Sequence, residues 1–213
     1  MQVALSINAR NEAEARNLAL RAARIVSQDG IIHIDVCDGA YTQNASWGDA
    51  SCWRAITPKG IKTEVHLMAR DWEARLVPWL HAGAFRIIVP VDVIGVDEAT
   101  RAREVAARYG AELMLSVSLA DAILSAVSYV GFGAFQILAV PTGRSGQQFN
   151  EGAIKKIKAL RAAMPNAILE VDGGMTPLNA ARAGEAGADI IVSSSYIWNA
   201  ENPHEAYQSL LRI

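Results

Sequence analysis

Residues 168–192 read ILEVDGGMTPLNAARAGEAGADIIV and contain one complete strand–helix–strand unit. The apolar runs Ile168 to Val171 and Asp189 to Val192 are typical of strands that are covered on both faces. Between them, Pro177 to Ala186 has the Ala-rich composition of a helix, and the preceding Thr is a common N-cap before Pro. The stretch therefore predicts a parallel βαβ unit.

The same alternation of apolar runs and Ala-rich, charged segments continues through the chain in both directions. The predicted strands are Val3 to Ile7, Ile31 to Val36, Thr63 to Met68, Phe85 to Val89, Glu112 to Ser116, Phe135 to Val140, Ile168 to Val171 and Asp189 to Val192. The predicted helices are Glu12 to Ser27, Asp71 to Ala82, Asp97 to Tyr109, Leu119 to Ala126, Glu151 to Met164, Pro177 to Ala186 and Pro203 to Leu211. The polar, aromatic stretch Gly39 to Pro58 predicts a long functional loop, with at most a short helix at Asp49 to Ala55.

Eight strands in 213 residues leave about 27 residues for each βα unit, which is close to the lower size limit of a (β/α)8 barrel. We therefore predict a single domain, residues 1–213, with the α/β class and the (β/α)8 TIM-barrel fold. A doubly wound open sheet fits less well, because no Gly-x-Gly-x-x-Gly turn follows the first strand.

Composition narrows the range of partners. The chain has 20 Lys and Arg against 22 Asp and Glu, a net charge of −2, so no basic excess points to nucleic acid. Charged and proline residues interrupt the longest apolar stretches, such as Phe85 to Val96, so we expect no membrane span. The N-terminal segment lacks the pattern of a secretory signal, and Cys37 and Cys52 are too few for a disulfide framework. We expect a cytoplasmic protein with free thiols.

Polar residues near the ends of predicted strands indicate a metal site. His33 and Asp35 lie two apart in one strand, so their side chains share a face. His66 and Asp172 lie at the ends of two other strands, and strand ends meet at the carboxyl face of a barrel. Each residue alone is better explained as a hydrogen-bonded polar group, but in the set of four, two carboxylates would repel without a cation between them. Two imidazoles and two carboxylates suit one divalent ion, Zn, Fe, Mn or Co.

Two further segments suggest where a substrate binds. Gly173 and Gly174 open a loop before a helix start, and three serines at 193–195 follow the last strand. The loops after the seventh and eighth strands commonly bind phosphate in this fold, although a tight turn and a helix cap are the simpler readings. Residues 141–149 contain two glycines and small polar residues, which suits either a closing lid or a plain surface loop.

Together these motifs resemble the ribulose-phosphate 3-epimerase family over Ser6 to Trp198. The resemblance implies a barrel of the ribulose-phosphate-binding type. The motifs that carry it are His33-Ile34-Asp35-Val36-Cys37-Asp38-Gly39 with Asn44, His66-Leu67-Met68, Val171-Asp172-Gly173-Gly174, Gly187-Ala188-Asp189 and Ser194-Ser195, with Ser6 after the first strand.

The resemblance also implies a function and a set of site residues. The expected reaction is C3 epimerisation of D-ribulose 5-phosphate to D-xylulose 5-phosphate through an enediolate, with Asp35 and Asp172 as acid and base. The expected metal ligands are His33, Asp35, His66 and Asp172. The residues expected to contact the phosphorylated ketose are Ser6, His66, Met68, Gly143, Arg144, Ser145, Gly146, Gly173, Gly174, Ser194 and Ser195.

Several positions depart from the family pattern and leave alternatives open. Cys37 and Leu138 stand where the family has methionine, Arg144 replaces a lid aromatic, and Ser194 replaces a glycine. A 3-epimerase of a six-carbon ketose phosphate, of the allulose 6-phosphate type, and a non-catalytic metal- and sugar-phosphate-binding paralogue are therefore alternatives. A Schiff-base aldolase needs a lysine at a strand end, and decarboxylating relatives are expected to carry Asp-x-Lys in the third strand. This chain has neither, so both activities are disfavoured. A homo-oligomer is also left open.

Overall fold

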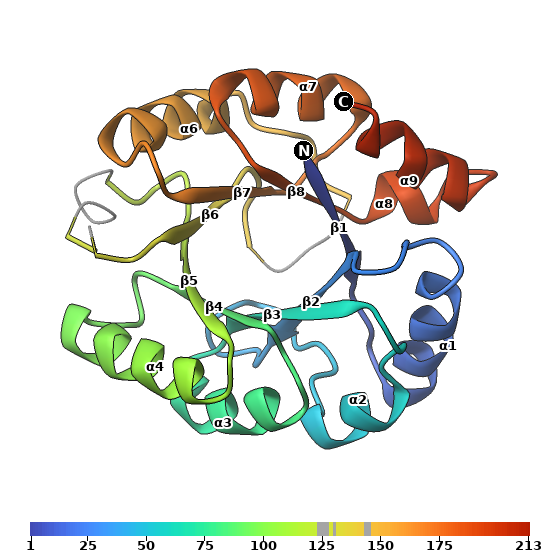
Figure 1. Cartoon of the computed structure of the whole chain (residues 1–213), viewed down its shortest axis with the longest axis horizontal. Helices are drawn as coiled ribbons and strands as arrows, with labels where there is room; N and C mark the ends of the chain where they lie inside the picture. The colour runs from blue at the N-terminus through green and yellow to red at the C-terminus, as the bar shows by residue number, and fades with distance from the viewer. Residues whose placement is uncertain (123–127, 130, 143–145) are drawn as a thin grey trace.

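The computed structural model describes residues 1–122, 128–129, 131–142 and 146–213. In this part of the chain, eight parallel strands pair in sequence order, and β8 pairs with β1 to close a barrel. Figure 1 views the barrel nearly along its axis, with the helices arranged in a ring outside the strands. The predicted TIM barrel is confirmed.

The strands lie close to their expected positions. They are β1 (Gln2–Ile7), β2 (Ile31–Cys37), β3 (Lys62–Met68), β4 (Arg86–Pro90), β5 (Glu112–Val117), β6 (Ala134–Leu138), β7 (Ile168–Asp172) and β8 (Ile190–Ser193). The described helices are α1 (Glu12–Ala22), α2 (Ala50–Ile56), α3 (Trp72–His81), α4 (Val96–Arg108), α6 (Gly152–Ala163), α7 (Pro177–Ala186), α8 (Ser195–Trp198) and α9 (Pro203–Leu211). None of these helices is both long and apolar enough to cross a bilayer.

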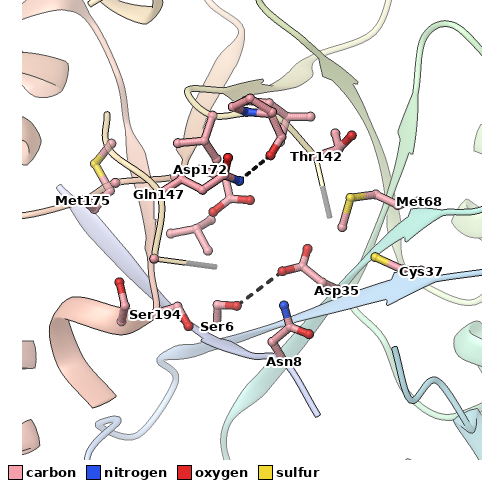
Figure 2. Close-up of a pocket in the computed structure, with 18 residues that line it drawn as sticks. Ser6, Asn8, Asp35, Cys37, Met68, Thr142, Gln147, Asp172, Met175 and Ser194 are labelled. Atoms are coloured by element: carbon pink, nitrogen blue, oxygen red, sulfur yellow. Dashed lines mark hydrogen bonds between the residues drawn. The ribbon is translucent and has the colours of Figure 1, made fainter. Parts of the chain in front are cut away.

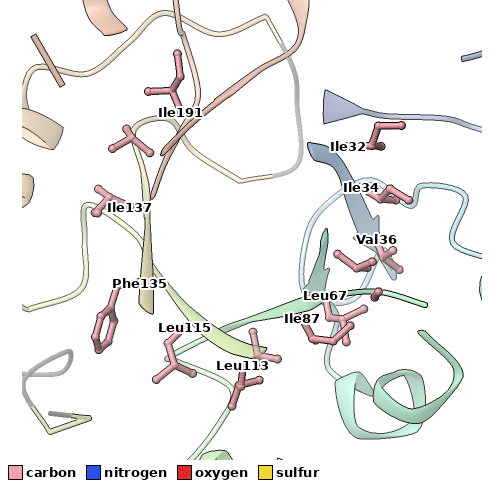
Figure 3. Packing of buried hydrophobic residues seen from close by; sticks show 14 of the residues in the cluster. Ile32, Ile34, Val36, Leu67, Ile87, Leu113, Leu115, Phe135, Ile137 and Ile191 are labelled. Atoms are coloured by element: carbon pink, nitrogen blue, oxygen red, sulfur yellow. The ribbon is translucent and has the colours of Figure 1, made fainter. Parts of the chain in front are cut away.

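Each strand divides its side chains between two environments. On β2, Ile32, Ile34 and Val36 belong to the hydrophobic core between the strands and the helices, which Figure 3 shows in close-up. Burying one such side chain stabilises the fold by about 1.5–3 kcal/mol. The alternate residues His33 and Asp35 point into the barrel, because successive side chains of a strand face opposite sides. The apolar outer layer thus holds the polar inner layer in place.

The unit that decides the fold forms as its sequence predicts. Thr176 caps α7, since its hydroxyl accepts a hydrogen bond from the backbone N–H of Asn179 at 3.3 Å. Pro177 opens the helix, where its missing N–H costs no hydrogen bond. Gly187 ends the helix in the left-handed region with a φ of 110°, and β8 begins three residues later.

Two helices differ from expectation. The helix predicted over Glu12 to Ser27 ends at Ala22, and residues beyond it form short turns such as the one from the N–H of Ile25 to the carbonyl of Ala22. Ile25 and the following Val are β-branched, and their burial in the core takes precedence over helical continuation. Of the helix predicted over Leu119 to Ala126, residues 119–122 are not helical, and residues 123–126 lie outside the described residues.

Asp38 joins two loops above the barrel. Its Oδ1 accepts the backbone N–H groups of Ala40 and Tyr41 at 2.8 and 2.7 Å, and its Oδ2 accepts that of Arg70 at 2.7 Å. Partial burial alone would raise the pKa of Asp38, but these three hydrogen bonds lower it below its ordinary value. The loops after β2 and β3 are therefore held by the ionised carboxylate.

Replacing Asp38 with Ala should lower the free energy of unfolding at neutral pH by about 1–3 kcal/mol, because hydrogen bonds to a charged acceptor are lost. Since the folded-state pKa is depressed, this contribution is present at neutral pH and disappears as the pH falls through that pKa. Urea unfolding of both proteins between pH 3 and 7 measures it. Equal stability of the two proteins at pH 7 would contradict this role.

Candidate active site

The four residues expected to bind metal meet inside the upper part of the barrel. Pairing of β2 with β3 places Asp35 beside His66, and both side chains face inward. One nitrogen or oxygen atom from each of His33, Asp35, His66 and Asp172 lies within 4.8 Å of the others. The structure thus brings together the residues that the sequence places on three separate strands.

His33 is held from both sides of its ring. Its Nδ1 lies 3.0 Å from Oε1 of Glu64, and its Nε2 lies 3.2 Å from Oδ1 of Asp35. A carboxylate only accepts hydrogen bonds, so Nδ1 donates to Glu64. This hydrogen bond orients Nε2 toward the centre of the cluster, as in metal sites where a carboxylate fixes the free nitrogen of a histidine ligand.

His66 contributes an unpaired nitrogen. Its Nε2 lies 2.9 Å from the hydroxyl of Ser116, whereas its Nδ1 is buried without a hydrogen-bond partner and lies 3.6 Å from Oδ1 of Asp35. A buried polar atom left unpaired costs about 1–3 kcal/mol. A divalent ion bound between this nitrogen, His33 and the carboxylates would satisfy it. The donor set therefore fits a divalent metal ion, and imidazole with carboxylate suits Zn, Fe, Mn or Co.

The two aspartates of the cluster differ in acidity because their neighbours differ. Burial alone would raise the pKa of Asp35, but the neighbouring His33 and His66 lower it well below its ordinary value. Burial, followed by the negative charge of Asp35, raises the pKa of Asp172 to about 7. Two negative charges this close oppose each other, and a divalent ion bound between the carboxylates would relieve that repulsion.

A pocket opens above the cluster at the carboxyl ends of the strands. Figure 2 shows the carboxyl groups of Asp35 and Asp172 pointing into the same space, with the hydroxyl of Ser6 donating to Asp35 at 3.5 Å. The expected substrate residues that line this pocket are Ser6, Met68, Gly146, Gly173, Gly174, Ser194 and Ser195. His66 lies in the cluster beneath it. Gly143, Arg144 and Ser145 lie outside the described residues, so their contact with substrate stays a prediction.

Gly174 lies where the loops after β6 and β7 touch. Its φ is +65°, and a Cβ added there would lie 2.5 Å from the backbone nitrogen of Phe149. Such a distance requires the backbone of the neighbouring loop to move. Gly110 has a similar φ of +70°, but nothing lies within 4 Å of its added Cβ. Comparing alanine substitutions at Gly174 and Gly110 therefore distinguishes the effect of steric contact from that of backbone strain.

Gly174→Ala should lower the free energy of unfolding by about 2–4 kcal/mol, against about 1–2 kcal/mol for Gly110→Ala, because only the first adds a steric clash to left-handed strain. The clash should also displace the loop after β6, part of which lines the pocket. Urea unfolding of both variants and the wild type measures the losses. Equal losses in the two variants would refute the contact with Phe149.

The structure also identifies residues that the motifs do not reveal. Asn8, Thr142, Gln147 and Met175 line the pocket beside the expected residues, and Gln147 donates to the carbonyl of Pro141 at 2.7 Å. Beneath the cluster, the barrel interior contains three charged residues, Glu64, Arg86 and Glu170. Glu64 and Glu170 each lie two residues before a metal-binding candidate, so the period of two along the strands is the signal that would have found them.

Comparison with known proteins decides the family. Residues 2–198 match the Ribulose-phosphate 3 epimerase family. The chain belongs to this family. It is 34% identical over 186 residues to the ribulose-phosphate 3-epimerase of Synechocystis, covering 82% of this chain and 78% of that protein. It is 32% identical over 187 residues to the chloroplastic ribulose-5-phosphate-3-epimerase of Arabidopsis thaliana, covering 84% of this chain and about two thirds (66%) of that protein. The resemblance seen in the motifs is confirmed.

More distant solved structures share the barrel. A 3-hexulose-6-phosphate synthase from Salmonella typhimurium aligns with a TM-score of 0.72 at 18% identity, covering 100% of this chain and 97% of that one. The protein named KGPDC from Streptococcus mutans aligns with a TM-score of 0.74 at 14% identity, covering 99% and 95%. At these identities the similarity supports the fold. The epimerase-family member described here combines that fold with the cluster of His33, Asp35, His66 and Asp172.

Proposed function

We propose that this protein catalyses metal-dependent epimerisation at C3 of a ketose phosphate, converting D-ribulose 5-phosphate to D-xylulose 5-phosphate. The observation that carries the proposal is the pair Asp35 and Asp172, which face one pocket while two histidine nitrogens converge beside them. Membership of the family supports the same reaction.

The metal-binding atoms follow from the hydrogen bonds. Nε2 of His33, Nδ1 of His66 and the carboxylates of Asp35 and Asp172 would hold the ion, because the other ring nitrogens are engaged by Glu64 and Ser116. A bound divalent ion supplies a Lewis acid, which polarises the carbonyl oxygen of the substrate and makes the neighbouring C–H more acidic.

Asp35 and Asp172 move the proton. One carboxylate removes the proton from C3 and leaves a planar enediolate, and the other delivers a proton to the opposite face, which inverts the centre. The two carboxylates face the same pocket, and which of them acts as the base depends on which epimer is bound. The roles exchange in the reverse direction.

The loops after β7 and β8 provide the phosphate site in this proposal. Gly173 and Gly174 have positive φ values of 112° and 65°, a conformation that glycine adopts readily, and they let this loop pass close to Val140 and Phe149. Ser194 and Ser195 line the same pocket and offer hydroxyl groups. Among the described residues that line the pocket, none is Lys or Arg, so backbone N–H groups and hydroxyls would bind the phosphate.

Apolar groups line the pocket beside both aspartates. Cys37 and Met68 are neighbours on β2 and β3, and Leu138 on β6 pairs in register with Asp172 on β7. Burial raises the pKa of the Cys37 thiol to about 11, so it is neutral at physiological pH and serves as a packing group. Such a surface keeps water away from the enediolate.

The substrate is tested by comparing D-ribulose 5-phosphate with D-allulose 6-phosphate on the metal-loaded protein. We expect a higher kcat/KM for the pentose phosphate. A preference for the hexose phosphate would establish the alternative, a 3-epimerase of a six-carbon ketose phosphate. Cys37 and Leu138, which stand where the family has methionine, would then make room for the longer sugar. Thermal stabilisation by both sugars without turnover of either would identify a non-catalytic binding protein.

A further inference from the structure

The barrel interior beneath the metal-binding cluster contains a buried network of charges. Glu64 on β3 and Glu170 on β7 are completely buried, and Arg86 on β4 is only 4% exposed. Burying an isolated charge is strongly unfavourable, so Glu64, Arg86 and Glu170 can be buried only because they contact one another. Among the residues that the structure describes, none from β4 lines the substrate pocket.

Arg86 contacts both glutamates. Its Nη1 donates to Oε2 of Glu64 at 2.8 Å and lies 3.6 Å from Oε2 of Glu170. On the other side, its Nε and Nη2 donate to Oε2 of the half-exposed Glu112 at 3.2 and 3.0 Å. Gln136 holds Glu170 from β6 by donating to its Oε1 at 2.9 Å. The guanidinium of Arg86 therefore lies between the half-exposed Glu112 on one side and the buried Glu64 and Glu170 on the other.

Glu64 links Arg86 to the metal-binding cluster. One of its oxygens, Oε2, accepts from Arg86, and the other, Oε1, accepts from Nδ1 of His33 at 3.0 Å. Nε2 of the same imidazole ring lies 3.2 Å from Asp35. An unbroken chain of contacts thus runs from Arg86 through Glu64 and His33 to Asp35. Without the guanidinium, Glu64 and Glu170 would repel each other, and Glu64 would lose the contact that fixes its plane.

We propose that Arg86 is a positioning residue for the metal centre: by anchoring Glu64, it orients the imidazole of His33 so that Nε2 faces the bound ion. Arg86 does not line the pocket and acts only through Glu64 and His33. This inference rests on the metal centre of the proposed function. It adds a group from β4, outside the motifs that identify the family, to the determinants of metal affinity.

Metal affinity tests the inference without reference to activity. The Kd for Co²⁺ is measured by competition with a chromophoric chelator, and the visible spectrum of the Co²⁺ protein reports the ligand geometry. Arg86→Met should weaken Co²⁺ binding by about 10–100-fold and change the spectrum at saturating metal, as loss of a group supporting a ligand does. Arg86→Lys should keep a positive charge near Glu64 but lose the forked donors that reach Glu64 and Glu112 together, so its affinity should lie between those of the wild type and Arg86→Met.

Glu112→Gln is the matched control. Glu112 contacts the side of the guanidinium that faces away from Glu64 and is half-exposed, so this variant should keep the wild-type affinity and spectrum. A purely structural role for Arg86 would lower the thermal stability of Arg86→Met but leave its Co²⁺ spectrum and affinity unchanged, and that result would overturn the inference.

Glu64→Gln decides the matter if Arg86→Met does not fold. The amide retains the size of Glu64 but cannot accept from Arg86 and His33 together, so Co²⁺ binding should weaken by about tenfold or more. If Glu64→Gln binds Co²⁺ with wild-type affinity, the positioning role of Arg86 is overturned, but the proposed metal centre is not. Absence of Co²⁺ binding by the wild-type protein would instead overturn the metal centre, and the inference with it.

Discussion

Replacing Asp172 with Asn should lower the rate of C3 epimerisation by about 10³–10⁴-fold, because the amide cannot exchange a proton with the substrate carbon. The substitution preserves size, so the packing of the pocket should survive. Asp35→Asn should have an effect of the same order, since the two carboxyl groups serve opposite faces of the intermediate. The measurement is the initial rate of xylulose 5-phosphate formation at saturating metal and substrate.

Asp172 is also a candidate metal ligand, so the metal content of Asp172→Asn has to be measured beside its rate. A variant that holds metal and has lost activity identifies the proton-transfer role. Asp71→Asn is the control, because Asp71 is an exposed carboxylate that pairs with Arg75 at the start of α3. It should keep the wild-type rate. An Asp172→Asn protein that binds metal and turns over within tenfold of the wild type would contradict the two-aspartate mechanism.

Removal of the metal should have the second large effect. Dialysis against a strong chelator should lower the rate by about 10³-fold or more, since Lewis-acid stabilisation of the developing negative charge contributes several kcal/mol. Adding back Zn²⁺, Mn²⁺, Co²⁺ or, without oxygen, Fe²⁺ should restore activity, and the order of the four ions would identify the preferred metal. Unchanged activity in a protein shown to be metal-free would exclude a metal-dependent reaction.

His66→Asn provides the matching variant. His66 supplies the unpaired Nδ1, and its other nitrogen contacts Ser116, so the substitution removes one metal-binding atom from the centre of the cluster. Its activity should stay low at metal concentrations that saturate the wild type and rise only at higher concentrations. Full activity at the wild-type metal requirement would show that His66 is not a ligand.

The sequence predicts much of this site because the relevant residues obey the geometry of strands. His33 and Asp35 share a face through their spacing of two, and the barrel brings the ends of β2, β3 and β7 to one mouth. Glycine loops after the last strands are equally local signals, and Gly173 and Gly174 line the pocket as expected.

The buried charges were harder to predict. Arg86 interrupts an apolar stretch, and a charged residue in a sequence is usually exposed. Its burial depends on Glu64, Glu112 and Glu170, which reach it from three other strands. Glu64 and Glu112 are register partners of Arg86 on the two neighbouring strands, whereas Glu170 reaches it from β7, and neither the register nor that longer contact can be read from local spacing. The early end of α1 at Ala22 has a similar origin, since the core takes up Ile25.

The most direct test of the account follows hydrogen exchange at C3. Proton NMR of the metal-loaded protein with D-ribulose 5-phosphate in D₂O should show loss of the C3 proton signal together with the appearance of xylulose 5-phosphate. Asp172→Asn should show neither change. A folded, metal-loaded wild-type protein that leaves the C3 proton of ribulose 5-phosphate in place would contradict the assignment of Asp35 and Asp172 as the acid–base pair for this substrate.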